Sequence, residues 1–591
     1  MPGLTYRSQK YKWVYLRPEK LLIKELSDQF GLTDCITEVL YKRGIVEPNT
    51  LQAFFDTPLT GLTSPFLIKD MGKAAEQIAL AIEKHEKICV YGDYDVDGVT
   101  SVALMYHFLS EVGADVMYYI PNRLEEGYGL NIAAIEEIAS ARVKLIITVD
   151  CGINAEEEVS HAVRMGMKVI VTDHHQPSER IPEDACAVVN PMREDDTSPF
   201  KCLSGVGVAF KTVMALRSKM NDMGKFGEKT PNIKKYLDLV TLGTVADVVP
   251  LVGENRIFVR HGLEILSGKD CRAGLKELKR VAGVDGGKVT TTHVGFGLAP
   301  RINAVGRLGN SDKGLRLLIT SDRAQAKFLA DELDRENKDR QEIEKDIIEE
   351  SFRRVEKNRL NEKYKGLVLY SKEWHQGVIG IVASRLVERY HMPAIVLTFG
   401  DGVGKGSGRS IPSFDLYKGL EQLQDILLSF GGHKYAAGLK ISEEHISSLQ
   451  RRFHTAVDES LSAEDFVAEL KIDSFIEPEA INTEFMKMIE RMEPYGAGNR
   501  EPVLCMKNVR KYQPATYVGR DSMHLKMFLE KNGRTFDCIG YNMKSYEKIV
   551  AGNEVFDVVF TPVVNGYYGG RYIQLVLKDL KPAEEEWQPI V

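Results

Sequence analysis

The sequence predicts an α/β protein built on a parallel, doubly wound sheet. Apolar runs of strand length alternate with helix-length segments from Asp70 to about Leu318, and this alternation is typical of parallel sheets with helices on both faces. Three of the runs end on carboxylates or histidines, at Asp93–Asp97, Asp150 and Asp173–His175. Because ligands bind beyond the carboxyl ends of such strands, the pattern also predicts a functional site.

The first two units are defined by where these runs begin. Residues 1–70 are predicted to be a helical lead-in packed on the core, and residues 71–320 the doubly wound unit. Its predicted strands are Lys87–Tyr91, Lys144–Val149, Lys168–Thr172 and Ala187–Val189. Each is an apolar run of strand length rich in branched residues, as a strand buried on both faces requires.

One long helix is predicted to follow within residues 321–360. The stretch from Ala324 to about Lys357 contains neither Gly nor Pro, and its middle, Asp334 to Glu342, is entirely polar. A helix that is polar all round usually crosses solvent between domains. The segment is therefore expected to connect two domains, with a helix packed in a bundle as the alternative.

Two further units are expected after this helix. Residues 361–457 read as a smaller, glycine-rich α/β unit, and residues 458–591 as a small barrel or sandwich. The second expectation depends on five short strand runs with Gly-rich turns, namely Val503–Met506, His524–Leu529, Thr535–Cys538, Val555–Val564 and Tyr572–Leu577.

Composition narrows the class of protein. The 591 residues are 43% hydrophobic and 27% charged, with a net charge of −7. These values are ordinary for a soluble globular protein, and no apolar run approaches the ~20 residues of a membrane helix. The eight cysteines include no C-x-x-C pair, and the chain start lacks the apolar core of a signal peptide. A cytoplasmic protein with reduced thiols and no membrane contact is expected.

The acidic triplet Asp93, Asp95 and Asp97 indicates a bound cation. Like charges crowded at a strand end are unfavourable unless a cation compensates them. An EF-hand calcium loop is excluded because it needs Glu at its twelfth position, where this chain has Leu104. An acidic surface turn remains the alternative when the triplet is considered alone.

Other residues of the same chemistry follow the later apolar segments. Asp150 ends one strand, His174 and His175 follow another, and Asp247 closes an apolar segment. Carboxylates and imidazole without thiolate suit Mn²⁺ or Mg²⁺ better than structural zinc. Five or six such ligands exceed the need of one catalytic ion, so two ions are expected, as in many enzymes that hydrolyse phosphodiesters.

The chain resembles the DHH phosphoesterase superfamily and, within it, the RecJ family of bacterial single-strand-specific 5′→3′ DNA exonucleases. The motifs that carry the resemblance run in order along most of the chain. They are Tyr91–Gly98, Val149–Gly152, Asp173–His175, Leu203–Gly207, Gly243–Asp247, Pro300–Arg307, Trp374–Gly380, Ser407–Ser410 and Gly431–His433.

The resemblance implies two ions, with Mn²⁺ preferred and Mg²⁺ as the alternative. The implied ligands are Asp95, Asp97, Asp150, His174 and Asp247, with Asp93 in or beside the set. Many superfamily members have His where this chain has Tyr91, so the distribution of the triplet between the ions stays open. The implied catalytic residues are Asp150, His174, His175 and His433.

The resemblance also implies substrate-binding residues. Residues 361–457 resemble the DHHA1 domain, where small residues let backbone N–H groups approach a phosphate and an arginine forms a bidentate fork. Residues 458–591 resemble an OB-fold, which binds single strands by stacking and charge; exposed tyrosines in a plain hairpin are the alternative. The candidates are Arg123, Arg301, Arg307, Ser407, Arg409, Ser410, Gly431, Gly432, His433, Tyr567, Tyr568 and Arg571.

The expected function is a single-stranded-DNA-specific 5′→3′ exonuclease that releases 5′-mononucleotides in DNA repair and recombination. A P-loop at Gly402–Gly406 is excluded, because Gly406 stands where Ser or Thr must follow the Lys. Two alternatives remain: a phosphodiesterase of short oligonucleotides or cyclic dinucleotides, and a non-catalytic single-strand-binding replication factor. Expected partners are single-stranded DNA with a free 5′ end, single-strand-binding protein and a helicase, and the chain is expected to be a monomer.

Overall fold

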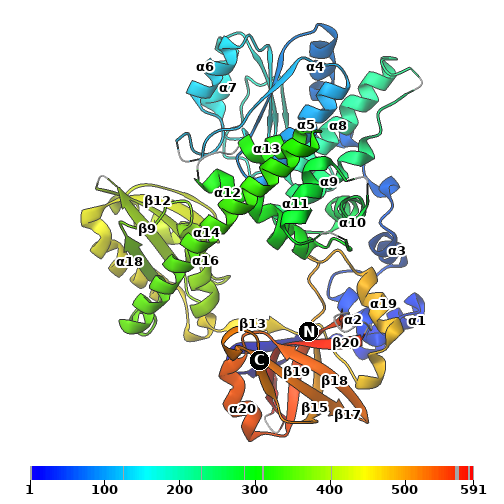
Figure 1. The fold of residues 1–591 in the computed structure, drawn as a ribbon, viewed down its shortest axis with the longest axis vertical. Helices are drawn as coiled ribbons and strands as arrows, with labels where there is room; N and C mark the ends of the chain where they lie inside the picture. The colour runs from blue at the N-terminus through cyan, green and yellow to red at the C-terminus, as the bar shows by residue number, and fades with distance from the viewer. Residues whose placement is uncertain are drawn as a thin grey trace.

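Three units built on β-sheets are arranged around a common centre, and the long helix α14 joins two of them (Figure 1). The computed structural model describes residues 3–123, 125–227, 229–269, 271–284, 286–308, 312–400, 402–565, 572–583 and 586–589. No helix in these ranges is long and apolar enough to cross a membrane.

The first unit contains a five-stranded parallel sheet of order β4-β3-β5-β6-β7. Its strands are β3 (Ile88–Gly92), β4 (Val116–Tyr119), β5 (Leu145–Val149), β6 (Lys168–Thr172) and β7 (Ala187–Val189). The four predicted strands are confirmed within a residue at each end. The four-residue β4, partly exposed at the sheet edge, was not predicted.

Helices cover both faces of this sheet, as predicted. One face packs against α4 (Met71–Glu83), α5 (Val96–Glu111) and α8 (Gly205–Asp222), and the other against α6 (Ile132–Ser140) and α7 (Glu156–Arg164). The chain leaves β3 towards β4 and returns to the other side as β5. The order of strands therefore reverses between β3 and β5, where sites in such sheets form.

Five more helices complete the unit on the side of α5 and α8. They are α9 (Leu237–Ala246), α10 (Gly253–Ser267), α11 (Ala273–Val281), α12 (Ala299–Leu308) and α13 (Asp312–Ile319). Helix α9 packs against α5 and α10. This packing places the C-terminal end of α9 beside the N-terminal end of α5.

The predicted connector is the single helix α14 (Arg323–Lys357). Its polar middle does not cross solvent as expected, because Asp334, Asn337, Arg340 and Glu344 are buried. The helix packs on α12 and on α16 of the next unit, and Arg301 of α12 donates from Nε to Asp334 Oδ1 at 2.9 Å. The polar face is thus buried in the joint between two units.

The second α/β unit has a sheet of order β11-β12-β10-β9-β8. Only β8 and β9 are parallel, and the remaining pairs are antiparallel. The elements are β8 (Leu367–Ser371), α16 (Ile379–Tyr390), β9 (Ala394–Gly400), β10 (Val403–Arg409), α17 (Leu416–Glu421), β11 (Leu427–Gly432), β12 (Ala436–Ser442) and α18 (Ile446–Ser460).

The C-terminal unit is a closed barrel, which settles the choice between barrel and sandwich. Strands β15, β19, β20, β18 and β17 pair in sequence, and β17 pairs back with β15. The strands of this ring are β15 (Leu504–Lys511), β17 (His524–Lys531), β18 (Arg534–Gly540), β19 (Val555–Asn565) and β20 (Tyr572–Pro582). The short β16 (Thr516–Val518) extends the sheet beside β17.

The first residues correct the prediction of a helical lead-in. Strands β1 (Gly3–Arg7) and β2 (Tyr11–Leu16) form a hairpin, and only α1 (Lys20–Phe30), α2 (Asp34–Tyr41) and α3 (Pro48–Asp56) are helices of more than one turn. Alternate residues of β2, Trp13 and Tyr15, are buried, which is the period of a strand and not of a helix.

The hairpin and α2 pack on the C-terminal unit, whereas the residues that follow α3 pack on the first unit, where Leu59, Leu62 and Ile68 join the core. The hairpin joins β13 (Ala468–Lys471) and β21 (Gln588–Pro589) in a sheet of order β13-β2-β1-β21. The indole Nε1 of Trp13 donates to the buried carboxylate of Asp579 at 2.6 Å, and α2 shares a core with α19 (Thr483–Arg491) and the barrel. The two ends of the chain lie side by side (Figure 1).

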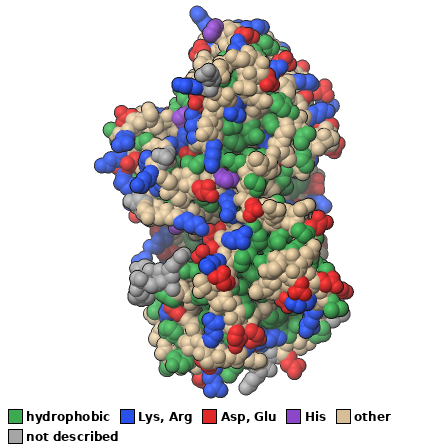
Figure 2. Space-filling view, turned by 90° about the vertical axis from the view of Figure 1, so that its right-hand side faces the viewer, with side chains coloured by type: hydrophobic (Ala, Val, Ile, Leu, Met, Phe, Trp, Pro, Cys, Tyr) green, Lys and Arg blue, Asp and Glu red, His purple; other side chains and the backbone are tan. Residues whose placement is uncertain are grey.

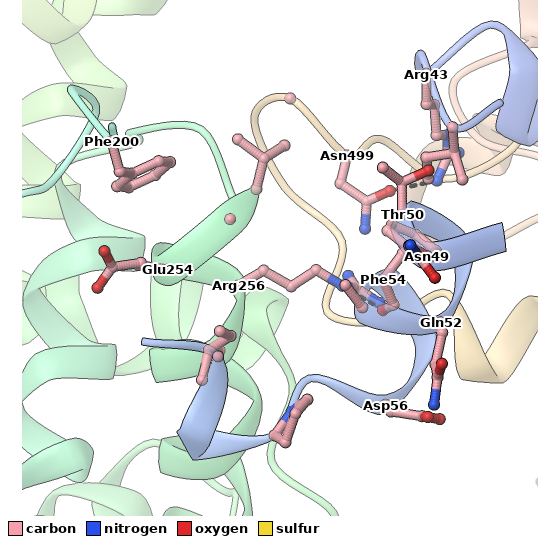
Figure 3. A pocket seen from close by; sticks show the side chains of 18 of the residues that line it. Arg43, Asn49, Thr50, Gln52, Phe54, Asp56, Phe200, Glu254, Arg256 and Asn499 are labelled. Atoms are coloured by element: carbon pink, nitrogen blue, oxygen red, sulfur yellow. Dashed lines mark hydrogen bonds between the residues drawn. The ribbon is translucent and has the colours of Figure 1, made fainter. Parts of the chain in front are cut away.

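Arg256 of α10 holds the first and last units together (Figure 3). The side chain is 2% exposed, and its guanidinium lies 3.9 Å over the ring of Phe54 on α3. Instead of a carboxylate, it contacts the backbone: it donates to the carbonyls of Phe54, Met492 and Glu493 at 3.0, 3.0 and 2.9 Å. The last two carbonyls follow α19, where a cation is favoured by the helix dipole.

Candidate active site

The acidic triplet lies where β3 passes into α5. Asp93 directly follows the strand and is 2% exposed. Asp95 is the N-cap residue of α5, and its Oδ1 accepts from the N–H groups of Asp97 and Gly98 at 2.9 and 3.1 Å. Asp97 is in the first turn of α5, and its two oxygens accept from Gly205 N–H at 2.6 Å and Val206 N–H at 2.9 Å.

Three neighbouring elements bring further ligands to the triplet. Asp150 follows β5, His174 follows β6, and Asp247 ends α9. The Nε2 atom of His174 lies 3.2 Å from Asp150 Oδ1, 3.7 Å from Asp247 Oδ2 and 3.9 Å from Asp97 Oδ2. His174 is therefore the centre of the cluster.

The cluster leaves buried polar atoms without hydrogen-bond partners. Among the residues that the structure describes, Asp93 Oδ1, Asp150 Oδ1, His174 Nε2 and Asp247 Oδ2 are buried and unsatisfied. An unsatisfied buried polar atom costs about 1–3 kcal/mol, so four at one place require an explanation. Bound divalent cations would explain these unsatisfied atoms. Two groups of residues could each hold one, because the ligand atoms within each group lie within 4.8 Å of one another: Asp150, His174 and His175, and Asp97, His174 and Asp247.

The electrostatics of the cluster agree with cation binding. Burial, followed by the charge of Asp95, raises the pKa of Asp93 to about 8. Burial and neighbouring carboxylates also raise the pKa values of Asp97, Asp150 and Asp247, while burial lowers the pKa of His174. Without a cation the carboxyl groups therefore hold protons that a bound ion would displace, whereas the lowered pKa keeps the imidazole of His174 neutral, the form that binds a metal.

Adding Mn²⁺ should raise the melting temperature more at pH 8 than at pH 6.5. In the metal-free protein the raised carboxyl pKa values, and the pKa of about 9 for His175, contribute stability that is lost as pH rises towards those values. His174 acts oppositely, but only around and below its ordinary pKa near 6.5. Thermal melts with Mn²⁺ and with chelator check this, and equal shifts at both pH values would contradict it.

Asp173 orients His175. Its Oδ1 lies 2.7 Å from His175 Nδ1 and accepts from the N–H groups of His174 and His175 at 2.7 and 3.1 Å. Its Oδ2 accepts from Ile153 N–H at 3.0 Å. Although burial acts in the other direction, the contacts with His175 lower the pKa of Asp173. An ionised Asp173 thus fixes the ring of His175 beside the cluster.

Glycines let three helices approach the ligands, and the motif analysis gave them no role. A Cβ on Gly205 would lie 2.6 Å from Cβ of Asp150, and one on Gly243 would lie 2.6 Å from Asp97 Oδ1. A Cβ on Gly98 would overlap the backbone of Asp93. The only sequence signal was their place within the matched motifs.

Tyr91 does not take the place of a metal ligand. Its ring lies on the opposite face of the sheet, within the core formed with α6 and α7, stacked on Tyr119 at 5.2 Å. Its hydroxyl donates to Gly129 O at 2.9 Å. Of the triplet, Asp93 keeps a buried oxygen unsatisfied, whereas Asp95 uses one oxygen to cap α5.

A second site, which we call the anion pocket, adjoins the triplet. It is a cavity of about 470 Å³, lined by Tyr94, Arg123, Gln376, Ser407, Arg409 and the first turn of α16. Arg123 lies 4.9 Å over the ring of Tyr94, and Arg409 donates to Ser407 Oγ at 3.0 Å. Residues of both the first and the second unit line the pocket, which therefore lies between them.

The anion pocket is positively charged. Burial, and then the charge of Arg123, lowers the pKa of Arg409. Helix α16 begins at the pocket without a side-chain cap, so its N–H groups and dipole add to the positive potential. Positive and negative side chains are interspersed over the face seen in Figure 2, so a charged local pocket of this kind is compatible with a net charge of −7.

The remaining predicted substrate residues are not gathered in one place. Gly431 and Gly432 end β11, and His433 is exposed in the turn before β12. Ser410 donates its hydroxyl to Phe414 O at 2.9 Å. Arg307 is on α12, but its side chain lies outside the described residues, as do Tyr567, Tyr568 and Arg571.

The guanidinium of Arg301 is engaged by contacts within the protein. Its guanidinium donates to Asp334 Oδ1, Gly297 O and Val281 O at 2.9, 2.6 and 3.2 Å. These contacts bind α12 to α14 and to the end of α11. Because its donors face the protein, we do not include Arg301 among the residues proposed to contact DNA.

Sequence families match three consecutive parts of the chain. The DHH family N-terminal domain matches residues 87–244, the DHHA1 domain residues 363–459, and the RecJ OB domain residues 472–579. Together with the ligand cluster, these domains define a metal-dependent phosphoesterase with a DHH core.

The single-stranded-DNA-specific exonuclease RecJ of Bacillus subtilis is 38% identical over 98% of this chain and 72% of its own length. The chain belongs to the RecJ family. RecJ of Escherichia coli is also 38% identical, over 86% of this chain and 90% of its own. Crystal structures of RecJ from Thermus thermophilus in complex with Mn²⁺ and Mg²⁺ match with TM-scores of 0.82 and 0.75, at 29% and 28% identity, over 97% of this chain and 80% and 79% of theirs.

Proposed function

We propose that the chain degrades single-stranded DNA from its 5′ end, releasing 5′-mononucleotides by metal-dependent hydrolysis in DNA repair and recombination. The observation that carries the proposal is the cluster of unsatisfied ligand atoms beside a positively charged pocket. A phosphodiester at the cluster and a terminal phosphate in the pocket would place the strand end at the reacting position.

The ligand set fits divalent cations such as Mn²⁺ or Mg²⁺. Asp93, Asp97, Asp150, His174 and Asp247 would hold them, with Asp95 adding its charge and its free oxygen. When bound, such ions activate water as a nucleophile and offset charge on the phosphate. The chain's own contribution is to hold these ligands in fixed positions through backbone N–H groups and helix starts.

His175 and His433 are proposed to act on the reacting phosphate. His175, whose pKa is raised to about 9 and whose Nδ1 faces Asp173, carries a proton near neutral pH beside Asp150. A protonated imidazole stabilises negative charge as it develops and donates to a leaving oxygen. His433, at an exposed turn of the DHHA1 unit, is the proposed partner from the opposite side.

The anion pocket is proposed to bind the 5′-terminal phosphate. Arg123, Ser407 and Arg409 supply side-chain donors, and the start of α16 supplies backbone N–H groups. A phosphate-binding pocket at the strand end makes degradation start from the 5′ end. It does so for any base sequence, because contacts to phosphate do not distinguish bases. Gln376 and Lys405, which bond to each other at 3.2 Å, complete the rim.

Arg409→Gln should lower kcat/KM on a 5′-phosphorylated strand by about 10- to 100-fold, since a charged hydrogen bond contributes roughly 1.5–3 kcal/mol. The same variant should lose little on a strand with a 5′-hydroxyl, so the preference between the two substrates should collapse. Arg385→Gln is the matched control, because Arg385 is an exposed arginine of the same unit whose partners are glutamates. Retention of the preference in Arg409→Gln would contradict the assignment.

Polarity and strand choice are tested with end-labelled substrates. Single strands labelled at the 5′ or the 3′ end, and the matching duplex, are incubated with Mn²⁺ or Mg²⁺. We expect labelled mononucleotide to appear first from the 5′ label, and little from duplex. Release from the 3′ label first, or no cleavage of any strand, would refute the proposed function.

The two alternative functions are less well supported. A phosphodiesterase of very short substrates has no evident use for the closed barrel, and a non-catalytic binding factor has no need of the unsatisfied ligand atoms. Comparing the rates of hydrolysis of long and short oligonucleotides distinguishes the exonuclease from the phosphodiesterase of short substrates. Binding of single strands without Mn²⁺-dependent cleavage would favour the non-catalytic factor.

We further propose a monomeric, cytoplasmic enzyme that meets single-strand-binding protein and a helicase at DNA ends.

A further inference from the structure

Phe296 is the most exposed large hydrophobic side chain in the described part of the chain, at 82%. It lies in the π-helical turn η4 (His293–Leu298) that leads into α12. No aromatic ring or cation stacks on it among the described residues. Single π-helical turns are frequent at functional sites, and an uncovered phenyl ring offers both faces to a partner.

Glycines flank the ring on both sides for no evident packing reason. The nearest atom to a Cβ placed on Gly295 would be Val245 Cγ1 at 3.8 Å, and on Gly297 it would be Val284 Cγ2 at 3.7 Å. These are ordinary contact distances, so alanine would fit at either position. The effect of the two glycines is instead to keep neighbouring side chains away from Phe296.

The turn that carries Phe296 contacts both the end of α9 and the C-terminal unit. Gly295 neighbours Val245, two positions before the ligand Asp247. On its other side, Thr291 donates to the carbonyl of Tyr495 at 2.7 Å, and Tyr495 precedes the first long barrel strand, β15. Helix α12, which follows Phe296, is at the edge of the first unit that faces the other two (Figure 1).

A second apolar side chain is exposed in the same region. Val248 directly follows Asp247, is 69% exposed and has φ +63°. A positive φ in a β-branched residue is strained, and such strain is concentrated at functional sites. Apolar surface is therefore exposed directly beside the ligand Asp247.

We propose that Phe296 is a stacking platform for a base of the single strand, on the 3′ side of the nucleotide being removed. The inference rests on the proposed function. A strand held at its 5′ end by the cluster and the anion pocket would continue towards the barrel, and the turn that carries Phe296 contacts both the end of α9 and the C-terminal unit. Stacking on an aromatic ring accepts every base, as an enzyme without sequence preference requires.

Phe296→Ala should raise KM about tenfold on long 5′-phosphorylated oligonucleotides and leave kcat nearly unchanged, the loss expected for one base–aromatic stack. The defect should vanish as the substrate is shortened below the length that reaches the ring. Phe296→Trp should restore KM, and its added fluorescence should be quenched by oligonucleotide. Phe328→Ala is the matched control, because Phe328 is 64% exposed on α14 and should change nothing.

An unchanged KM in Phe296→Ala overturns the proposal, and so does a raised KM that Trp fails to restore or that is equal at every substrate length. Failure of the proposed function would look different, since the parent protein would then not cleave single strands from the 5′ end. If Phe296 instead binds a second copy of the chain, the parent chain alone will show a Phe296-dependent change in mass by light scattering, with no change in KM.

Discussion

Asp150→Asn should lower the rate of single-strand hydrolysis by at least about a thousand-fold, the effect of losing roughly 4 kcal/mol of transition-state stabilisation. Asp150 has a buried, unsatisfied Oδ1 and lies 3.2 Å from His174 Nε2. The amide keeps the size of the side chain but removes its charge, so the variant should also bind Mn²⁺ weakly by calorimetry.

Asparagine is a better test than alanine at this position. Asp150 has φ +60°, a left-handed conformation that Asn and Asp tolerate more readily than other residues with a side chain. Asp521→Asn is the matched control, because Asp521 has φ +57° in an exposed turn of the C-terminal unit. Full Mn²⁺-dependent activity in a folded Asp150→Asn protein would refute the metal site.

Gly205→Ala should reduce activity by about a hundred-fold or more, although Gly205 is not a ligand. The added methyl would lie 2.6 Å from Asp150 Cβ and overlap its carboxylate, and displacing a reacting group by about 1 Å has a cost of this order. The same crowding should destabilise the fold by roughly 1–3 kcal/mol, measured by denaturant titration.

Gly72→Ala is the control for this substitution. Gly72 lies in α4, and nothing would approach its Cβ within 4 Å, so alanine there should stabilise the helix by about 0.5–1 kcal/mol and leave activity unchanged. If Gly205→Ala retained normal activity, the close approach of α8 would not be needed to position Asp150.

The catalytic sheet could be predicted because one rule governs both fold and site. A parallel strand buried on both faces is a continuous apolar run, and its end is where polar residues become possible. Asp93, Asp150 and His174 each follow such a run, so the pattern that located the strands also located the ligands. Asp247 ends a helix instead, so its sequence pattern was only a lone Asp closing an apolar segment.

The N-terminal hairpin and the buried face of α14 could not be predicted in this way. Trp13 and Tyr15 alternate as a strand requires, but their partners in space come from the other end of the chain. Asn337 and Arg340 are polar in sequence, and they are buried because they bond to each other at 2.7 Å. Polarity predicts exposure only when a residue has no partner to satisfy it.

The roles of Asp173 and Gly205 could not be predicted from sequence motifs. Both belong to matched motifs, yet their roles depend on distances to Asp150, His175 and the start of α8. A spacing of residues along the chain does not contain those distances. The structure was needed to separate residues that hold an ion from residues that hold the ligands in place.

The sheet formed by β13, β2, β1 and β21 has a consequence for how the protein is made. Trp13 and Asp579, which it brings together, are 566 positions apart in sequence. A ribosome therefore delivers the first hairpin long before its partners exist, while both α/β units emerge complete and can fold in turn. Contacts of such long sequence separation form slowly, so the N-terminal hairpin should remain sensitive to protease on nascent chains until the last barrel strands have left the exit tunnel.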